Sequence, residues 1–141
     1  VYKRQLYYYM LVTYYNGVPL ILEEPVYAHG SLPRASREEV VRAILDDLND
    51  IIDRELLDWQ WTKAADQGRA TRGAAMALKA RLLLFEASKL VNPSNDAAKW
   101  QAAADAAKAI DTDLNHCENP PVEFALGPSP ILSYSTPLYT V

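Results

Sequence analysis

The chain is poor in the residue types on which several kinds of chemistry depend. Cys117 is its only cysteine, so neither an intramolecular disulfide nor a thiolate metal cluster can form. Its two histidines, His29 and His116, are far apart, and neither has a neighbour at metal-ligand spacing. The sequence also holds no catalytic triad and no phosphate-binding loop. We therefore expect no metal, no cofactor and no enzymatic activity.

Long hydrophobic runs and clusters of positive charge are missing too. Charged residues interrupt every window of the roughly 20 residues that a helix needs to cross a bilayer, so no membrane span is predicted. The 14 Lys and Arg are scattered and are outnumbered by 18 Asp and Glu, which gives a net charge of -4. This balance argues against nucleic acid as a partner.

What is present favours a folded helical protein. Apolar residues make up 50% and charged residues 23% of the 141 positions, as in ordinary globular domains. The chain begins with Val1 instead of Met, shows no secretory leader and enters a helical pattern at once. We therefore expect an internal fragment of a longer protein.

The first half of the sequence predicts two helices. Residues 3–15 carry one stripe of apolar and aromatic side chains at spacings of three and four, and Gly17 and Pro19 then stop the helix. A cluster of five tyrosines in this helix is expected to be mainly core; it consists of Tyr7, Tyr8, Tyr9, Tyr14 and Tyr15. A capping box at Ser36 and Glu39 opens the second helix, predicted over residues 37–56.

The second half predicts a helical hairpin. Thr71 is the expected N-cap of a nearly all-apolar helix that runs to about Val91 and should be central, and residues 96–110 form its alanine-rich partner. The tail is rich in proline and predicts coil. We predict an all-α fold of tetratricopeptide-like hairpins with irregular loops, with residues 1–111 as a partial helical domain and residues 112–141 as an irregular tail.

Four sequence segments, in this order, carry a family resemblance. They are Tyr15-Asn16-Gly17-Val18-Pro19-Leu20, the stretch from Leu32 to Val40, Gly68-Arg69-Ala70-Thr71-Arg72-Gly73-Ala74-Ala75, and the alanine helix from Trp100 to Ile110. Together they resemble the SusD/RagB family of bacterial surface lipoproteins. The resemblance implies a SusD-like helical fold whose hairpins mainly face a TonB-dependent, SusC-like outer-membrane transporter.

The same resemblance implies a function. Members capture a glycan or oligosaccharide at the cell surface and pass it to the transporter for nutrient uptake. The resemblance also implies a location at the outer membrane, exposed at the cell surface and held by a lipid anchor. The lipidated cysteine of the family would lie outside this chain, because Cys117 is too far from the N-terminus to replace it.

Candidate sugar contacts are few. Carbohydrate binding needs flat aromatic faces beside amides or carboxylates, and Trp59 and Trp61 are the pair that a loop could present in this way. An alternative for these indoles is that one folds back over the helices. The acidic residues of the second helix run along its surface, and we interpret them as a solvated face that binds no metal; they are Asp46, Asp47, Asp50 and Asp53.

A second class of function fits the same helices. A tetratricopeptide-like adaptor would hold a protein or peptide in an exposed groove lined by tyrosine and by the Ala103 face of the last helix. A glycan-cleaving enzyme is disfavoured, because no two carboxylates can be assigned to opposed positions.

Overall fold

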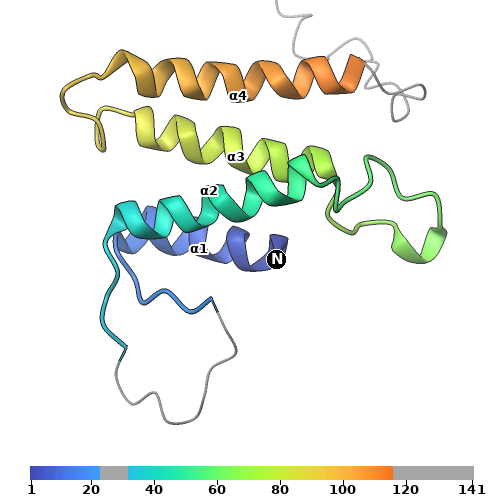
Figure 1. The fold of residues 1–141 in the computed structure, drawn as a ribbon, viewed down its shortest axis with the longest axis horizontal. Coiled ribbons are helices and arrows are strands. Elements are labelled where there is room, and N and C mark those ends of the chain that lie inside the picture. The colour runs from blue at the N-terminus through green and yellow to red at the C-terminus, as the bar shows by residue number, and fades with distance from the viewer. Residues whose placement is uncertain (23–31, 116–141) are drawn as a thin grey trace, which may run out of the picture.

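The computed structural model describes residues 1–22 and 32–115, and within these ranges the regular secondary structure is all helical, with loops between the helices. Its elements are α1 (Tyr2–Tyr15), α2 (Arg37–Asp53), the 3-10 turn η1 (Ala64–Asp66), α3 (Arg72–Ala87) and α4 (Ala97–Asn115). Successive α-helices run in opposite directions and lie side by side (Figure 1). The predicted all-α fold is confirmed.

The ends of the predicted helices need correction. The second helix stops at Asp53 instead of residue 56, and the third stops at Ala87 instead of Val91. The last helix runs on to Asn115, so residues 112–115 are helical although we assigned them to the coil tail. The rest of that tail, with His116 and Cys117, lies outside the described residues, and so does His29. Propensity decides such ends weakly, because packing of the last turn overrides it.

The core lies between α1, α2 and α3. Val40, Ile44 and Leu48 recur along one face of α2 and are fully buried, as the predicted stripe requires. They meet Val12 of α1 and Leu82 of α3 in one cluster of buried side chains. Helix α2 therefore packs against both α1 and α3 and holds them in one core.

Helix α3 occupies the centre of the bundle, as its nearly all-apolar sequence predicts. It packs against α1, α2 and α4, whereas α4 contacts only α3 among the described helices. Among the residues of α4 whose burial is described, 97–113, Ala103 is the buried one. The last two helices therefore form a hairpin, and no other helix of the described ranges packs on α4.

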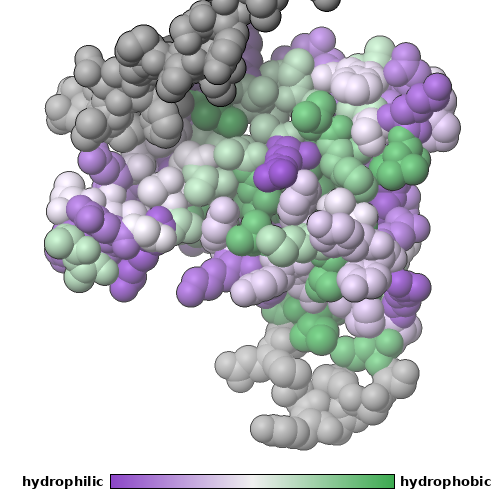
Figure 2. Space-filling view, turned by 180° about the vertical axis from the view of Figure 1, so that it is seen from behind, coloured by the Kyte–Doolittle hydropathy of each residue, from purple (hydrophilic) through white to green (hydrophobic). Residues whose placement is uncertain are grey.

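Helix α1 departs from the prediction. Its buried residues are Gln5, Tyr8 and Val12, and most of the apolar stripe that we expected to face the core points outward, although Leu6 packs partly buried against the core. Tyr14 is 80% exposed, and the stripe also exposes Tyr7, Met10, Leu11 and Tyr15. Seen from behind, the molecule carries hydrophobic side chains among polar ones on its surface (Figure 2). Three of the five tyrosines are therefore exposed, while Tyr8 lies in the core and Tyr9 packs partly buried against it.

Candidate functional site

Two of the sequence segments that carry the family resemblance, residues 15–20 and 32–40, contact each other where α1 ends and α2 begins, which we call the first joint. The backbone N–H of Ala35 donates to the carbonyl of Val18 at 3.1 Å. Arg34 donates from Nη2 to the carbonyl of Tyr15 at 3.0 Å and from Nε to the carbonyl of Gly17. A guanidinium thus satisfies carbonyls that the end of α1 leaves without helical partners.

The turn after α1 depends on two unlike residues. Asn16, and not Gly17, takes the left-handed conformation, with φ 66° and ψ -117°. Gly17 is required for a different reason, because a Cβ at this position would lie 2.2 Å from the carbonyl oxygen of Ala35. The helix stop that we assigned to Gly17 is therefore supplied by Asn16, while the glycine lets two backbone segments touch.

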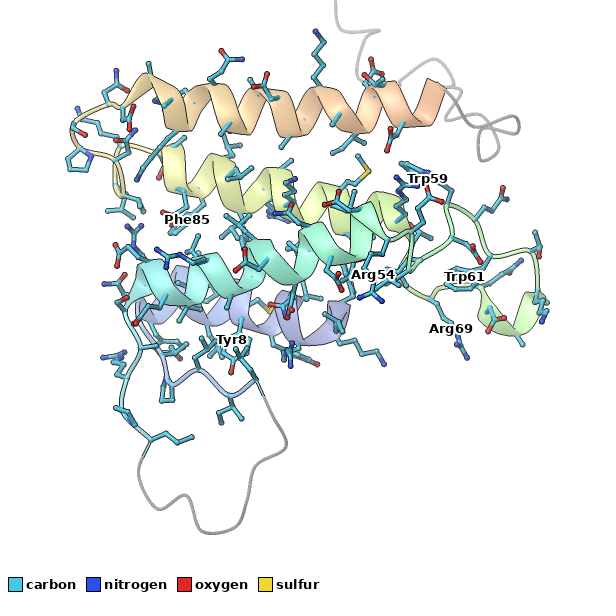
Figure 3. The ribbon with its side chains drawn as sticks, in the orientation of Figure 1. Tyr8, Arg54, Trp59, Trp61, Arg69 and Phe85 are labelled. Atoms are coloured by element: carbon cyan, nitrogen blue, oxygen red, sulfur yellow. The ribbon has the colours of Figure 1, made fainter. Side chains whose placement is uncertain are left out.

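The segment from Gly68 to Gly73 forms a second joint, where the loop after α2 enters α3, at the opposite end of the bundle (Figures 1 and 3). The hydroxyl of Thr71 accepts a hydrogen bond from the N–H of Ala74 at 3.3 Å, which confirms Thr71 as the N-cap of α3. Arg72 donates to Glu55 at 2.8 Å, and its guanidinium lies 3.8 Å from Asp113 of α4. The arginine therefore links the start of α3 to both neighbouring segments.

Both candidate tryptophans belong to this second joint. A Cβ on Gly73 would lie 2.7 Å from the ring of Trp59, so that indole packs directly on the first turn of α3. The indole N–H of Trp61 donates to the carbonyl of Ala70 at 3.1 Å. Each ring remains half-buried. Figure 3 shows both at the end of the molecule where the loop between α2 and α3 lies.

The acidic residues of α2 do not converge. Asp46, Asp50 and Asp53 are exposed, and Asp47 turns toward α1 to accept a hydrogen bond from Arg4 at 2.5 Å. Within residues 1–22 and 32–115, no group of three His, Cys, Asp or Glu is arranged to hold a metal ion. These carboxylates thus act as solvated groups and as one interhelical ion pair.

The capping box has an electrostatic consequence. The backbone N–H of Ser36 donates to Glu39 at 2.8 Å, and the serine hydroxyl donates to the same carboxylate at 2.9 Å. These hydrogen bonds hold the pKa of Glu39 below its ordinary value of 4.5. Backbone hydrogen bonding, followed by the Arg37 guanidinium, lowers the pKa of neighbouring Glu38 in the same direction. Both glutamates are exposed and remain charged at neutral pH.

Two surface grooves at one end of the bundle were missed by sequence analysis, whereas a third contains the Ala103 face that it expected in an exposed groove. Two open grooves, of about 600 Å³ and about 530 Å³, flank the end of the bundle where α1 stops and α2 starts, and both are lined by Asn16, Arg37 and Glu38. A third, of about 340 Å³, lies between α3 and α4 and is lined by Ala80, Arg81, Leu84, Trp100, Ala103, Ala104 and Ala107. The one sequence signal for the first two was the Tyr-Tyr-Asn-Gly turn, which we treated as a helix stop.

Comparison with known proteins places this architecture. No family model and no curated protein sequence matches the chain. Among solved structures, the surface glycan-binding protein A from Bacteroides uniformis matches with a TM-score of 0.58 at 24% sequence identity. The two share a fold. The match covers 77% of this chain but only 22% of that protein, so this chain corresponds to a small part of its structural neighbour.

One observation bears on whether a helix of this chain could cross a membrane. None of the helices in the described part of the chain combines the length and the apolar character that crossing a bilayer requires.

Proposed function

We propose that the protein is a non-catalytic glycan-binding component of an outer-membrane nutrient-uptake system of the SusD/RagB type. It would be exposed at the cell surface, tethered through a lipid anchor outside this chain, and would deliver oligosaccharide to a TonB-dependent, SusC-like transporter. The observation that carries this proposal is the fold shared with a surface glycan-binding protein.

The structural role of the segments that resemble the SusD/RagB family supports the same proposal. Three of them build joints of this fold: the segments around Gly17 and Ala35 pair with each other, and the segment around Thr71 caps α3. The segments that carry the family resemblance are therefore also segments that connect the helices of this fold.

Within that system this chain would serve mainly as scaffold and as transporter-facing helices. Its outward apolar side chains on α1, among them Tyr7 and Leu11, give it a surface suited to protein contact. Trp59 and Trp61 are the proposed sugar contacts. The indole N–H of Trp61 is already bonded to Ala70, so this residue would offer a sugar only its ring face.

A titration of the full-length protein tests the function. Maltohexaose, cellohexaose, mannohexaose and xylohexaose are added in turn while tryptophan fluorescence is followed, and at least one should give saturable quenching. Trp61→Ala should then weaken binding, whereas Trp100→Ala, a matched change at an exposed indole on α4, should not. A flat response of the native protein to all four sugars would count against the proposal.

The adaptor function has one observation in its favour. The groove between α3 and α4 is almost wholly apolar and holds the exposed side chains of Leu84 and Trp100, as a helix-binding groove would. Affinity capture from detergent-solubilised membranes separates the two functions. Recovery of a β-barrel transporter supports glycan uptake, and recovery of soluble peptide partners alone supports the adaptor.

A further inference from the structure

The turn that follows α1 presents three side chains whose polar groups form no hydrogen bond in the described part of the chain. The amide of Asn16 and the hydroxyls of Tyr14 and Tyr15 take part in no hydrogen bond within residues 1–22 and 32–115. Tyr14 is 80% exposed and Tyr15 62% exposed. Two aromatic faces and a free amide therefore lie in consecutive positions at one end of the bundle.

The conformation of Asn16 adds a second, independent observation. A residue with a Cβ at φ 66° and ψ -117° is strained, and glycine adopts this backbone without cost. Gly17 is the next residue, yet it does not take the left-handed position. The chain thus keeps an amide side chain where a hydrogen atom would serve the backbone better.

The Asn16 side chain lies at the wall of two surface grooves. Asn16, Arg37 and Glu38 line both grooves at this end of the molecule, with Tyr15 on one groove and Tyr14 on the other. Each groove, at about 600 Å³ and about 530 Å³, falls in the range of about 300–1,000 Å³ that is typical of ligand sites. Phe85 of α3 closes the second groove, at the end of the bundle where Figure 3 labels it.

The charges favour a neutral ligand. Arg37 is held between Glu86 at 2.9 Å and Glu38 at 3.0 Å, and its side chain is only 15% exposed. Arg34 and Glu39 add one charge of each sign to the groove wall. The Glu38 side chain is 66% exposed, and its carboxylate, which bonds Arg37 and a backbone N–H, has further lone pairs that can accept from a hydroxyl group.

We propose that the turn formed by Tyr14, Tyr15 and Asn16 is a binding site for a neutral sugar. The inference rests on the proposed function and gives it a place on this chain, separate from Trp59 and Trp61. The apolar face of a pyranose would stack on Tyr14, and its hydroxyls would bond the Asn16 amide and the Glu38 carboxylate.

Calorimetric titration of the full-length protein with the same four hexasaccharides tests this site. Tyr14→Ala should raise the Kd for a bound sugar about tenfold, the loss of one aromatic contact. Asn16→Gly should raise it about threefold, the loss of one hydrogen bond, without lowering the melting temperature, because glycine relieves the strained backbone. Tyr7→Ala is the matched control: this tyrosine is 66% exposed on the same helix and lines neither groove at this end.

The outcomes separate the two proposals. If a sugar binds the native protein and the isotherms of Tyr14→Ala and Asn16→Gly match that of Tyr7→Ala, the turn is no sugar site, and glycan binding elsewhere stands. A lower melting temperature of Asn16→Gly would assign the amide a structural role and also overturn the site. If none of the four sugars binds the native protein, the proposed function fails and the site fails with it.

Discussion

Single polar residues fix the connections between these helices. Asn92 is 3% exposed in the link between α3 and α4, and its side chain replaces the backbone pairing that this irregular segment lacks. Its amide donates to the carbonyls of Ala87 and Asp96 at 3.4 Å and 3.2 Å, and its oxygen accepts from the N–H of Asp96 at 3.0 Å. One side chain thus holds the end of α3 against the start of α4.

Replacing that amide should destabilise the hairpin. Asn92→Ala removes the partner of the buried carbonyl of Ala87 and of the carbonyl and N–H of Asp96, and we expect it to lower the free energy of unfolding by about 2 kcal/mol. Ser94→Ala is the control, since the exposed hydroxyl donates only to Asn92 itself, and it should change the free energy by less than about 0.5 kcal/mol. Urea unfolding of the full-length protein measures both. Equal effects of the two changes would contradict this account.

The two glycines at the joints should respond differently to alanine. A Cβ at position 17 meets the backbone of Ala35, which cannot move away, so Gly17→Ala should cost about 1–3 kcal/mol. A Cβ at position 73 meets only the ring edge of Trp59, and alanine gains about 1 kcal/mol of helix propensity there. Thermal melts should show the larger loss for Gly17→Ala. A larger loss for Gly73→Ala would mean that Trp59 is the more rigid obstacle.

At the scale of the element, α2 shows how local sequence and packing cooperate. Its start is set by Ser36 and Glu39, whose side chains satisfy each other's backbone N–H groups. Its buried face is set by the spacing of Val40, Ile44 and Leu48. Both features are local, and the sequence predicted both.

The cap should make the stability of α2 dependent on pH. The pKa of Glu39 is lower in the folded chain than its ordinary value of 4.5, so its carboxylate stabilises the fold above pH 4.5 and loses this effect as the pH falls below it. Glu39→Gln keeps a capping hydrogen bond but cannot ionise. We expect the native protein to exceed this variant in urea midpoint at pH 7, and the difference to shrink toward pH 3. A constant difference would exclude the carboxylate as the cause.

Removal of the serine tests the other half of the same cap at a single pH. Ser36→Ala deletes the acceptor for the N–H of Glu39 and should lower the free energy of unfolding by about 1 kcal/mol at neutral pH. Urea unfolding measures the loss. A change of a few tenths of a kcal/mol would show that water replaces the hydroxyl.

At the scale of the whole molecule, the described residues leave apolar surface uncovered on two sides. Helix α1 exposes Tyr7, Leu11 and Tyr14, and the α3–α4 hairpin exposes Leu84 and Trp100. Exposed apolar patches of this kind promote association.

The 141 residues expressed alone should therefore self-associate and bind a dye such as ANS. Leu84→Lys and Leu11→Lys place charges on the two exposed faces and should each reduce association. Light scattering after size-exclusion chromatography measures the state. A monodisperse monomer with a sharp cooperative melt would prove this prediction wrong.

The sequence by itself determined the local structure: four helices, the caps at Ser36 and Thr71, and the buried face of α2, because these depend on residues within a few positions of one another. It did not determine which face of α1 is buried, since apolar spacing alone cannot say whether a neighbour covers it. Tertiary structure also decided that Asn16, Arg37 and Glu38 share one groove wall. Those residues come together only because the ends of separate helices meet, which no local pattern records.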